Sequence, residues 1–484
     1  MFSLNERLIE AKDKVTKLYS VPLNIADDMV DLLDSTDFFN EPALGMTAED
    51  YVNNHRVIDI SCKSGSLLFS FYKRFMVALR NVFPDRDDRE LFIMRYLLYG
   101  LCPDKRYLDL VHNTFYSNQK YDLSNELGNF YHYDFKEQSG VDRKEVKELL
   151  ENMKFDVVCG NPPYNDDMYL DFVMLGHKLA KSYDLWITPA KWQAKMDDGS
   201  KEFRDCIVPY MKKIVVYKTS TDVFDITAPD GISYYLIGKE ISKHYVKCVS
   251  NTSSVFSSSF ELHSEKSLTL VPQRVLDIIN KLGSSLCDKL DFKQSKYIKN
   301  TSTGYSCRHN TTDLEVLQGD SVCGYLPIDE ALSTDRINYY KCYTNIMPGV
   351  GVVYLDKNGT SLGLNKVNKA LPNQIPKGSY PCLAYFKTEQ EANGFLSFCD
   401  TKLVKFAHLV GICGTTITSE FWRFVPDPGS FDKVYEDKPL EGYVPDENGI
   451  YTDINGVVHC SLYVKYKLTD EEINVIESVI RERK

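Results

Sequence analysis

Short apolar runs, each ending at a polar or small residue, recur through the first half of the chain. They lie at residues 56–59, 96–102, 129–134, 155–160 and 185–192, and helix-like apolar spacing lies between several of them. The run at 155–160 contains β-branched residues without alternation, which is typical of a buried parallel strand. Strands that alternate with helices predict an α/β fold built on a doubly wound sheet. Ligands of such sheets bind where the strands end, so the residues after each run are the candidates for a site.

The second half of the chain shows short strand-like runs between turns. The run 352–355, followed by the turn residues Asp-Lys-Asn-Gly at 356–359, predicts a β-hairpin. Residues 393–428 predict a helix, a Gly-rich stretch and then an apolar strand that ends at a proline. A final amphipathic helix is expected to begin at Thr469 or Asp470, either of which can cap it.

Composition narrows the class of protein. A chain of 484 residues is long enough for two or three domains, and 43% hydrophobic with 26% charged residues is typical of a soluble globular protein. No apolar stretch approaches the roughly 20 residues that span a bilayer, and the acidic N-terminal segment does not resemble a signal peptide. The 13 cysteines are scattered without a Cys-x-x-Cys pair, which argues against a disulfide framework and a zinc site. A reducing cytoplasm is the expected location.

The turn after the run 155–160 has the most specific chemistry. It reads Asn161-Pro162-Pro163-Tyr164. The Asn side-chain oxygen and the next carbonyl can both accept hydrogen bonds from one exocyclic NH2 group, while the two prolines fix φ and remove competing donors. The aromatic ring offers a flat base a surface for stacking. The turn therefore suits the binding of a planar amine, although a Pro-rich turn whose Tyr simply packs in the core is the alternative.

A second candidate site follows the run 56–59. The small residues Ser61, Cys62, Ser64 and Gly65 come after Asp59 and lead into a helical pattern. A strand, a small-residue loop and a helix make room for a cofactor against backbone amides. Other strand–loop–helix units share this pattern, so the loop by itself does not identify a cofactor.

Polar residues also follow the next two strands. Asp104 ends one of them and Asp134, with Phe135 beside it, ends the other. Asp104 is equally suited to cap the helix that follows, and an Asp after a strand is commonly a turn residue. Upstream of all these segments, Tyr19 and Pro22 precede an amphipathic helix, for which Pro22 would also be an ordinary first-turn residue.

In this order the segments resemble the S-adenosylmethionine-dependent DNA adenine-N6 methyltransferases of restriction-modification systems. The resemblance is to the Asn-Pro-Pro-Tyr amino-methyltransferases with a gamma-like order of motifs, and it covers roughly residues 17–240. It implies a Rossmann-like methyltransferase sheet followed by a C-terminal mixed α+β target-recognition domain. It also implies S-adenosylmethionine as the cofactor, double-stranded DNA as the substrate and no metal.

The resemblance assigns roles to individual residues. Asn161 and the carbonyl of Pro162 would hold the N6 amine of an adenine flipped out of the duplex, with Pro163 shaping the turn and Tyr164 stacking on the base. Tyr234 or Tyr235, in a closing hairpin expected within residues 224–236, would supply a second stacking surface. The residues implied for cofactor binding are Tyr19, Pro22, Asp59, Ser61, Cys62, Ser64, Gly65, Asp104, Asp134 and Phe135.

Three positions depart from the family pattern. Lys63 stands where the first Gly of the cofactor loop is usual, Ile60 replaces the usual Pro, and Cys102 replaces an acidic residue that grips the ribose. A side chain at residue 63 can crowd the methionine part of the cofactor or require an unfavourable φ. The departures predict weakened cofactor binding.

The expected domains are a catalytic domain at 1–245, a Ser-, Thr- and Asn-rich connecting segment at 246–290 and a target-recognition domain at 291–484. Net charge is −11, so contact with DNA has to rely on a local basic surface. Candidate DNA-binding residues, which can equally belong to solvated loops, are Arg308, Lys366, Lys369, Thr415 and Thr416.

Two alternative functions remain open from the sequence. Lys63 and Cys102 are compatible with a methyltransferase-like protein that binds DNA without efficient catalysis. The Asn-Pro-Pro-Tyr turn is also shared by N-methyltransferases of RNA and of protein glutamine. If the DNA function holds, a separate restriction endonuclease is a possible partner.

Overall fold

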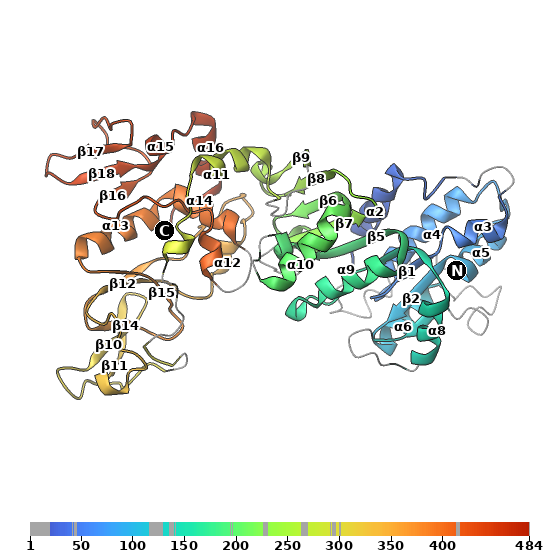
Figure 1. Ribbon diagram of the computed structural model, residues 1–484, viewed down its shortest axis with the longest axis horizontal. Coiled ribbons are helices and arrows are strands. Elements are labelled where there is room, and N and C mark those ends of the chain that lie inside the picture. Colours follow the sequence, from blue (N-terminus) through green and yellow to red (C-terminus); the bar gives the residue numbers. More distant parts are fainter. Residues whose placement is uncertain are drawn as a thin grey trace. The chain divides into compact units, whose positions relative to one another are not determined.

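The computed structural model describes residues 20–40, 42, 46–115, 129–134, 140, 142–193, 195, 197–225, 231–262, 270–290, 292, 297–299, 302–412 and 417–483. The chain forms two compact units (Figure 1): Met1–Val249 with Ser259–Leu270, and Ser250–Ser258 with Val271–Lys484. The segment 246–290, expected to connect two domains, is thus divided between the units. Among the described residues, no helix combines the length and apolar character needed to cross a bilayer.

A nine-stranded sheet organises the first unit, with the order β3-β2-β1-β4-β5-β7-β6-β8-β9. Its strands are β1 (Val57–Asp59), β2 (Leu98–Cys102), β3 (Phe130–His132), β4 (Phe155–Gly160), β5 (Ala180–Pro189), β6 (Met211–Tyr217), β7 (Ile232–Ile237), β8 (His244–Val249) and β9 (Ser258–Leu262). The first five pair in parallel, and β7 is antiparallel to both β5 and β6.

Helices cover both faces of this sheet (Figure 1). One apolar cluster packs on one face, and its helical members come from α2 (Leu23–Val30), α3 (Ala48–Asn53), α4 (Ser66–Ala78), α5 (Arg86–Tyr96) and α6 (Lys105–Phe115). A second cluster packs on the other face, with α8 (Arg143–Asn152), α9 (Met168–Leu179) and α10 (Asp198–Ile207). Short 3-10 helices in this unit are η1 (Asp31–Ser35), η2 (Asn165–Asp167), η3 (Ala190–Gln193), η4 (Val208–Tyr210) and η5 (Ser220–Asp222).

The strand order places a topological switch point between β1 and β4. From β1 the chain adds β2 and β3 on one side, and it then returns to add β4 and β5 on the other side. The expected doubly wound α/β sheet, followed by a C-terminal mixed α+β region, is confirmed by this architecture. Ligands of such sheets bind at the carboxyl ends of the strands beside the switch point.

The second unit combines three three-stranded sheets with helices, and their strand orders are β11-β10-β14, β13-β12-β15 and β16-β18-β17. Its strands are β10 (Leu314–Gln318), β11 (Ser321–Leu326), β12 (Tyr340–Tyr343), β13 (Asn368–Ala370), β14 (Gln374–Pro376), β15 (Cys382–Phe386), β16 (Val434–Glu436), β17 (Ile450–Thr452) and β18 (Val458–Ser461). Its helices are α11 (Gln273–Lys281), α12 (Val350–Val353), α13 (Glu389–Asp400), α14 (Lys402–Gly411), α15 (Leu462–Lys465) and α16 (Asp470–Val479), with 3-10 helices η6 (Ser254–Phe256), η7 (Cys287–Lys289), η8 (Ile328–Glu330) and η9 (Ser419–Trp422).

The hairpin expected at residues 352–359 is wrong. The turn does form, because the Asp356 carboxylate accepts hydrogen bonds from the amides of Asn358 (2.9 Å) and Thr360 (3.0 Å). Before it, however, Val352 and Val353 belong to the helix α12, while Tyr354 and Leu355 belong to no strand. Ser361 after the turn bridges to Ile480. The strand partner therefore lies far away in the sequence.

Two other expectations need correction. The closing hairpin of the first unit is formed by β6 and β7, since residues 224–225 precede β7 without pairing to it. The apolar strand expected at the end of 393–428 does not form: Phe421 and Trp422 belong to the 3-10 helix η9, which follows the helices α13 and α14, and Pro426 makes an isolated bridge to Ser285. The final helix is confirmed, since Thr469 caps α16 by accepting from the Glu472 amide (3.3 Å).

Candidate functional site

Two glycines shape the carboxyl edge of the first sheet. Gly65 has φ +76° and precedes α4, and a Cβ there would lie 2.8 Å from the Phe115 ring. Gly160 ends β4, where a Cβ would overlap Ser61 Oγ and lie 3.0 Å from the Trp186 ring. Only a residue without a side chain lets the end of β4 approach the loop after β1 this closely.

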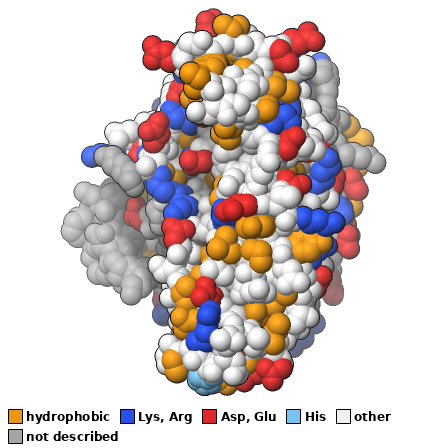
Figure 2. All heavy atoms as spheres, turned by 90° about the vertical axis from the view of Figure 1, so that its left-hand side faces the viewer, with side chains coloured by type: hydrophobic (Ala, Val, Ile, Leu, Met, Phe, Trp, Pro, Cys, Tyr) orange, Lys and Arg blue, Asp and Glu red, His pale blue; other side chains and the backbone are white. Residues whose placement is uncertain are grey.

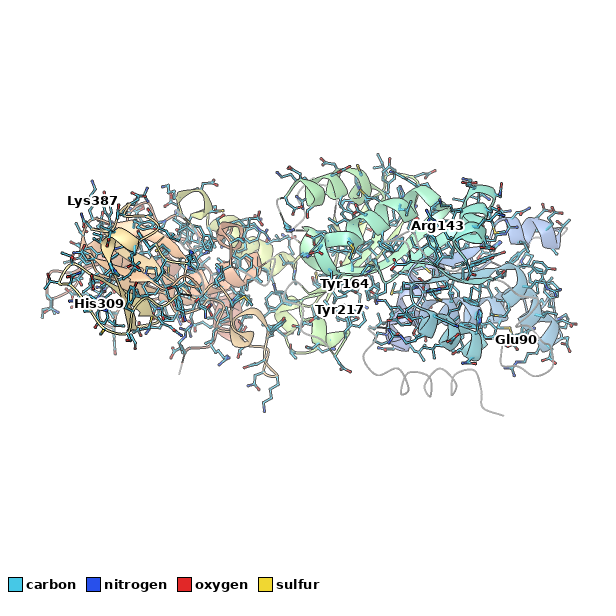
Figure 3. The ribbon with its side chains drawn as sticks, turned by 90° about the horizontal axis from the view of Figure 1, so that it is seen from below. Glu90, Arg143, Tyr164, Tyr217, His309 and Lys387 are labelled. Carbon is cyan, nitrogen blue, oxygen red and sulfur yellow. The ribbon has the colours of Figure 1, made fainter. Side chains whose placement is uncertain are left out.

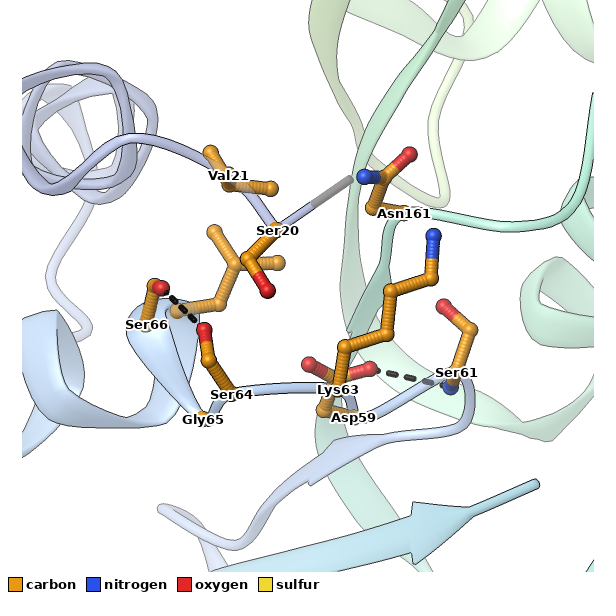
Figure 4. Close-up of a pocket in the computed structure, with 10 residues that line it drawn as sticks. Ser20, Val21, Asp59, Ser61, Lys63, Ser64, Gly65, Ser66 and Asn161 are labelled. Carbon is orange, nitrogen blue, oxygen red and sulfur yellow. Dashed lines mark hydrogen bonds between the residues drawn. The ribbon is translucent and has the colours of Figure 1, made fainter. Parts of the chain in front are cut away.

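A pocket lies at this edge, at the switch point (Figure 4). Its lining comes from the segment before α2, the loop after β1, the start of α4 and the residue after β4: Ser20, Val21, Asp59, Ser61, Lys63, Ser64, Gly65, Ser66, Leu67 and Asn161. The sequence therefore predicted residues of two separate motifs, the small-residue loop and Asn161, that the fold brings to one cavity.

Opposite charges meet in the pocket. Burial raises the pKa of Asp59 to about 7, against the lowering effects of the Ser61 amide, which donates to Asp59 Oδ1 (2.9 Å), and of Lys63. Burial also lowers the pKa of Lys63 to about 8, opposed by Asp59. Figure 4 shows the Lys63 side chain extending from the loop toward Asn161. The pocket thus contains a buried carboxylate with a raised pKa and a half-buried ammonium group with a lowered pKa.

The Asn161–Tyr164 turn runs from the pocket into the first apolar cluster. Asn161 is 4% exposed, Pro162 is buried, and Pro163 and Tyr164 are half-buried. Tyr164 packs against the same apolar cluster as Tyr217 (both labelled in Figure 3). Burial raises the pKa of the Tyr164 hydroxyl, which has no hydrogen-bond partner among the described residues.

The other residues implied for the cofactor lie outside this lining. Cys62 is fully buried, beside Cys102, whose side chain hydrogen-bonds to it and raises its pKa. Asp104 accepts from the amide (2.8 Å) and the guanidinium (2.6 Å) of Arg106 at the start of α6, the capping role that was its alternative. Asp134 follows β3 and is half-buried, and Pro22 is the N-cap of α2. Tyr19 and Phe135 lie outside the described residues.

Tyr234 and Tyr235 point to opposite faces of β7, as alternation requires. Tyr234 belongs to the cluster on the α4 face and lies beside Tyr217, with ring centroids 6.1 Å apart and ring planes tilted by 37°. Tyr235 belongs to the cluster on the α9 face, and its hydroxyl lies 3.2 Å from Thr188 Oγ1. Both rings are nearly inaccessible, at 3% and 0% exposure, so neither surface is open to a base in this structure.

Four lining residues were not among the expected ones. Ser20 and Val21 lie directly between the predicted Tyr19 and Pro22, and Ser66 and Leu67 directly follow Gly65. Adjacency to a motif was the only signal for them. Lys63 was expected only to obstruct, whereas the structure makes it part of the pocket wall.

The basic candidates of the second unit are each paired with an acid. Arg308 contacts Glu315 (2.8 Å), Lys369 contacts Glu389 (2.6 Å), and Lys366 forms an ion pair with Asp320. On the face seen in Figure 2, Lys and Arg side chains are interspersed with Asp and Glu. Thr415 and Thr416 lie outside the described residues. Among the residues that the structure covers, no group of three or more His, Cys, Asp or Glu side chains could hold a metal ion.

No family model and no curated protein matches the chain. Solved structures of distant similarity include the ATP-dependent Type ISP restriction-modification enzyme LlaBIII bound to DNA, 9% identical over 98% of this chain and 48% of that one, with a TM-score of 0.44. The type IIG restriction endonuclease BpuSI is 9% identical over 99% of this chain and 68% of its own, with a TM-score of 0.39. The type I restriction enzyme EcoKI M protein is 12% identical over 49% of each chain, with a TM-score of 0.34, so the match spans about half of its length.

Proposed function

We propose that this chain is an S-adenosylmethionine-dependent DNA methyltransferase that acts on the N6 amine of adenine. The observation that carries the proposal is the placement of Asn161 on the wall of the same pocket as Asp59 and the Gly65 loop. An amine-holding turn and a cofactor-type loop share one cavity at the switch point of a doubly wound sheet. This combination is what transfer of a small group to a planar amine requires.

The donor set of the pocket fits S-adenosylmethionine in charge. The Asp59 carboxylate suits the cationic groups of the cofactor, and the start of α4, which Gly65 precedes, offers amides to a carboxylate. Ser20, Ser61 and Ser64 add hydroxyls. When bound, this cofactor supplies an electrophilic methyl group on a sulfonium.

The chain's own residues act by positioning. Asn161 and the Pro162 carbonyl accept hydrogen bonds from the target amine and orient its lone pair, while the Tyr164 ring stacks on a base turned out of the duplex. Aimed acceptors favour the charge that develops on the nitrogen during attack. Pro162 and Pro163 keep these acceptors in place, because neither has an amide hydrogen and both fix φ.

Asp104, Asp134, Cys62, Pro22, Tyr19 and Phe135 complete the proposed cofactor site. The second unit is proposed to recognise duplex DNA, with Arg308, Lys366, Lys369, Thr415 and Thr416 as candidate contacts. Each of the three cations in this set forms an ion pair with a carboxylate in the structure. A DNA phosphate that binds one of them has to compete with that carboxylate. Tyr234 or Tyr235 can stack on a base only after β7 rearranges, given their burial. We place the protein in a restriction-modification system, with a separate nuclease as a possible partner.

The test is transfer of a tritiated methyl group from S-adenosylmethionine to duplex DNA by the purified chain. Asn161→Ala should lower the transfer rate by roughly two orders of magnitude or more, since it removes an acceptor aimed at the reacting nitrogen. Asn165→Ala, at the exposed first residue of η2 directly after the turn, is the matched control and should retain the rate. Product analysis that shows no N6-methyladenine contradicts the proposal.

One observation favours a second candidate, a methyltransferase-like DNA-binding protein with weak or no activity. The pocket has room for only about 10 Å³ with Lys63 on its wall, far less than the ~300–1,000 Å³ typical of small-molecule sites. Calorimetry that detects no S-adenosylmethionine binding, together with retained DNA binding, would establish this candidate instead. RNA and protein extract as parallel acceptors test the remaining alternatives, RNA and protein glutamine.

A further inference from the structure

The backbone directly after the Asn161–Tyr164 turn is held in an unusual conformation. Asp166 (φ 52°, ψ 30°) and Asp167 (φ 60°, ψ 16°) are both left-handed. Among the described residues, five non-glycine residues have a positive φ, and these two are the only consecutive pair. Conformations of this kind persist where the surrounding contacts enforce them, and they concentrate at functional sites.

Two lysines supply the enforcing contacts. The Asp167 carboxylate forms an ion pair with Lys191 and another with Lys195, whose Nζ lies 2.5 Å from Asp167 Oδ2. All three side chains are half-buried, with exposures between 20% and 32%. Burial alone would raise the pKa of Asp167, but the hydrogen bonds from both lysines outweigh it, and the pKa is lowered. Asp167 is the N-cap residue of α9, but its side chain accepts no hydrogen bond from the helix amides. Its carboxylate pairs with the two lysines instead.

The lysines come from a firmly anchored segment. They belong to η3 and the residues after it, which follow β5, and β5 pairs in parallel with β4 at Gly160 and Trp186. The buried guanidinium of Arg204, on α10, donates to the carbonyls of Trp192 (2.6 Å) and Lys195 (2.7 Å). Lys195 also lies 3.3 Å from Asp197, which caps α10. An isolated surface ion pair contributes little, whereas a partly buried network on a fixed platform restricts geometry.

We infer that Asp167 is a positioning residue for the proposed methyl transfer: its ion pairs with Lys191 and Lys195 fix the loop that carries Asn161 and Tyr164. We call these two ion pairs the Asp167 clamp. The inference rests on the proposed function, because it gives the clamp a role in that reaction. Asp167 itself is not among the residues that line the pocket. Loss of the clamp therefore leaves the acceptors in the site but lets the turn move.

Asp167→Asn is the informative variant, since Asn tolerates the left-handed conformation and removes only the charge. We expect kcat to fall between about tenfold and a hundredfold, because small displacements of positioning groups have effects of this size. The dissociation constant for S-adenosylmethionine, measured by calorimetry, should change less than twofold. The matched control is Asp198→Asn. The exposed Asp198 carboxylate lies 3.7 Å from Lys201, and its removal should leave kcat unchanged.

Hydrogen exchange of a peptide that covers residues 161–168 gives a readout independent of activity. In Asp167→Asn the amides of this peptide should exchange several-fold faster than in the wild type. Adding Lys191→Met and Lys195→Met to Asp167→Asn should increase the exchange rate little further. Unchanged exchange overturns the clamp, and faster exchange with unchanged kcat overturns its role in positioning. If the wild-type chain transfers no methyl group, the proposed function fails, whereas the exchange measurement still decides whether the clamp exists.

Discussion

At the scale of single residues, Lys63 has the largest influence on the charge and the free volume of the pocket. Its side chain lines the cavity together with Asp59 and Asn161. A ligand with a sulfonium and an ammonium group has to share this space with an internal cation, and Coulomb repulsion in a poorly solvated pocket is stronger than in water. We therefore expect residue 63, where the family pattern has a glycine, to be the position at which this chain limits binding of the proposed cofactor.

Lys63→Ala should raise the affinity for S-adenosylmethionine by about tenfold, or about 1.4 kcal/mol. It removes both the charge and the volume, whereas Lys63→Met removes mainly the charge and should give a smaller gain. Calorimetry measures the dissociation constants. The control for a lysine outside the pocket is Lys73→Ala on α4, which loses an ion pair with Asp27 on α2 (2.5 Å). A weaker affinity in Lys63→Ala would instead identify Lys63 as a ligand of the cofactor's carboxylate.

The same pair of charges predicts how binding depends on pH. The pKa of Asp59 is raised to about 7, so its carboxylate is lost as the pH falls below that value. The pKa of Lys63 is lowered to about 8, so its competing charge is lost as the pH rises above that value. Both changes make the affinity for a cationic ligand increase from pH 6 to pH 9.

Asp59→Asn should flatten the lower part of this profile, and Lys63→Met should flatten the upper part. Comparison of each variant with the wild type at every pH removes the titration of the ligand itself. An affinity that falls with pH in the wild type, or that has the same slope in all three proteins, would contradict the assignment of these two groups.

About half of the candidate site could be predicted from the sequence. Asp59, Ser61, Ser64, Gly65 and Asn161 follow strands, and the parallel arrangement brings strand ends together. The charge state of Lys63 could not be predicted, because it depends on burial among residues of other segments. The burial of Tyr234 and Tyr235 could not be predicted from the sequence either. The alternation of side chains along a strand assigns the two residues to opposite faces of the sheet, but it does not show that helices cover both faces.

At the scale of elements, the approach of β4 to the loop after β1 sets a strict limit on residue 160. A Cβ on Gly160 would overlap Ser61 Oγ and crowd the Trp186 ring. Gly160→Ala should therefore lower the free energy of unfolding by about 1–3 kcal/mol, the usual cost of overpacking. Ser61→Ala in the same chain removes one of the two obstacles and should restore part of the loss, which denaturant titration can measure.

Gly199→Ala is the control for this substitution. Gly199 lies in the helix α10, where a Cβ would meet only Asp197 Oδ1 at 3.4 Å, and alanine is favoured in helices. It should leave the stability unchanged or raise it by up to ~1 kcal/mol. Equal effects of the two alanines would show that the close approach at Gly160 is not restrictive.

Elements with a strong local pattern were the predictable ones. The buried run of β4 and the capped start of α16 are visible without any tertiary information. The strand expected at 352–355 was a wrong prediction. Asp356 closes the turn that follows it by a hydrogen bond from the Thr360 amide, but Ser361 after the turn pairs with Ile480 and not with residues 352–355. Short apolar runs of this length suit a helix as well as a strand, and only distant contacts decide between them.

At the scale of the whole molecule, the chain passes between the units three times. Residues Ser250–Ser258 belong to the second unit, and Ser259–Leu270 return to the first. Leu270 is 4% exposed within the cluster on the α9 face, and its carbonyl accepts from Cys248 Sγ (3.8 Å). A boundary near residue 245 was predicted because the composition changes there, but the returning segment has no pattern that marks it.

A fragment of residues 1–270 should therefore be more stable than a fragment of residues 1–249. The shorter fragment loses β9, which borders β8 at the edge of the sheet, and loses Leu270 from the core. Burial of a leucine side chain contributes roughly 1.5–3 kcal/mol, and an uncovered strand edge promotes association between chains. A loss of this size lowers Tm by several degrees, about 2–4 °C for each kcal/mol in a domain of this length. Thermal unfolding followed by circular dichroism measures the difference, and calorimetry should detect S-adenosylmethionine binding in the longer fragment. Equal Tm values would mean that the returning segment is dispensable for stability, and the first unit would then end at β8.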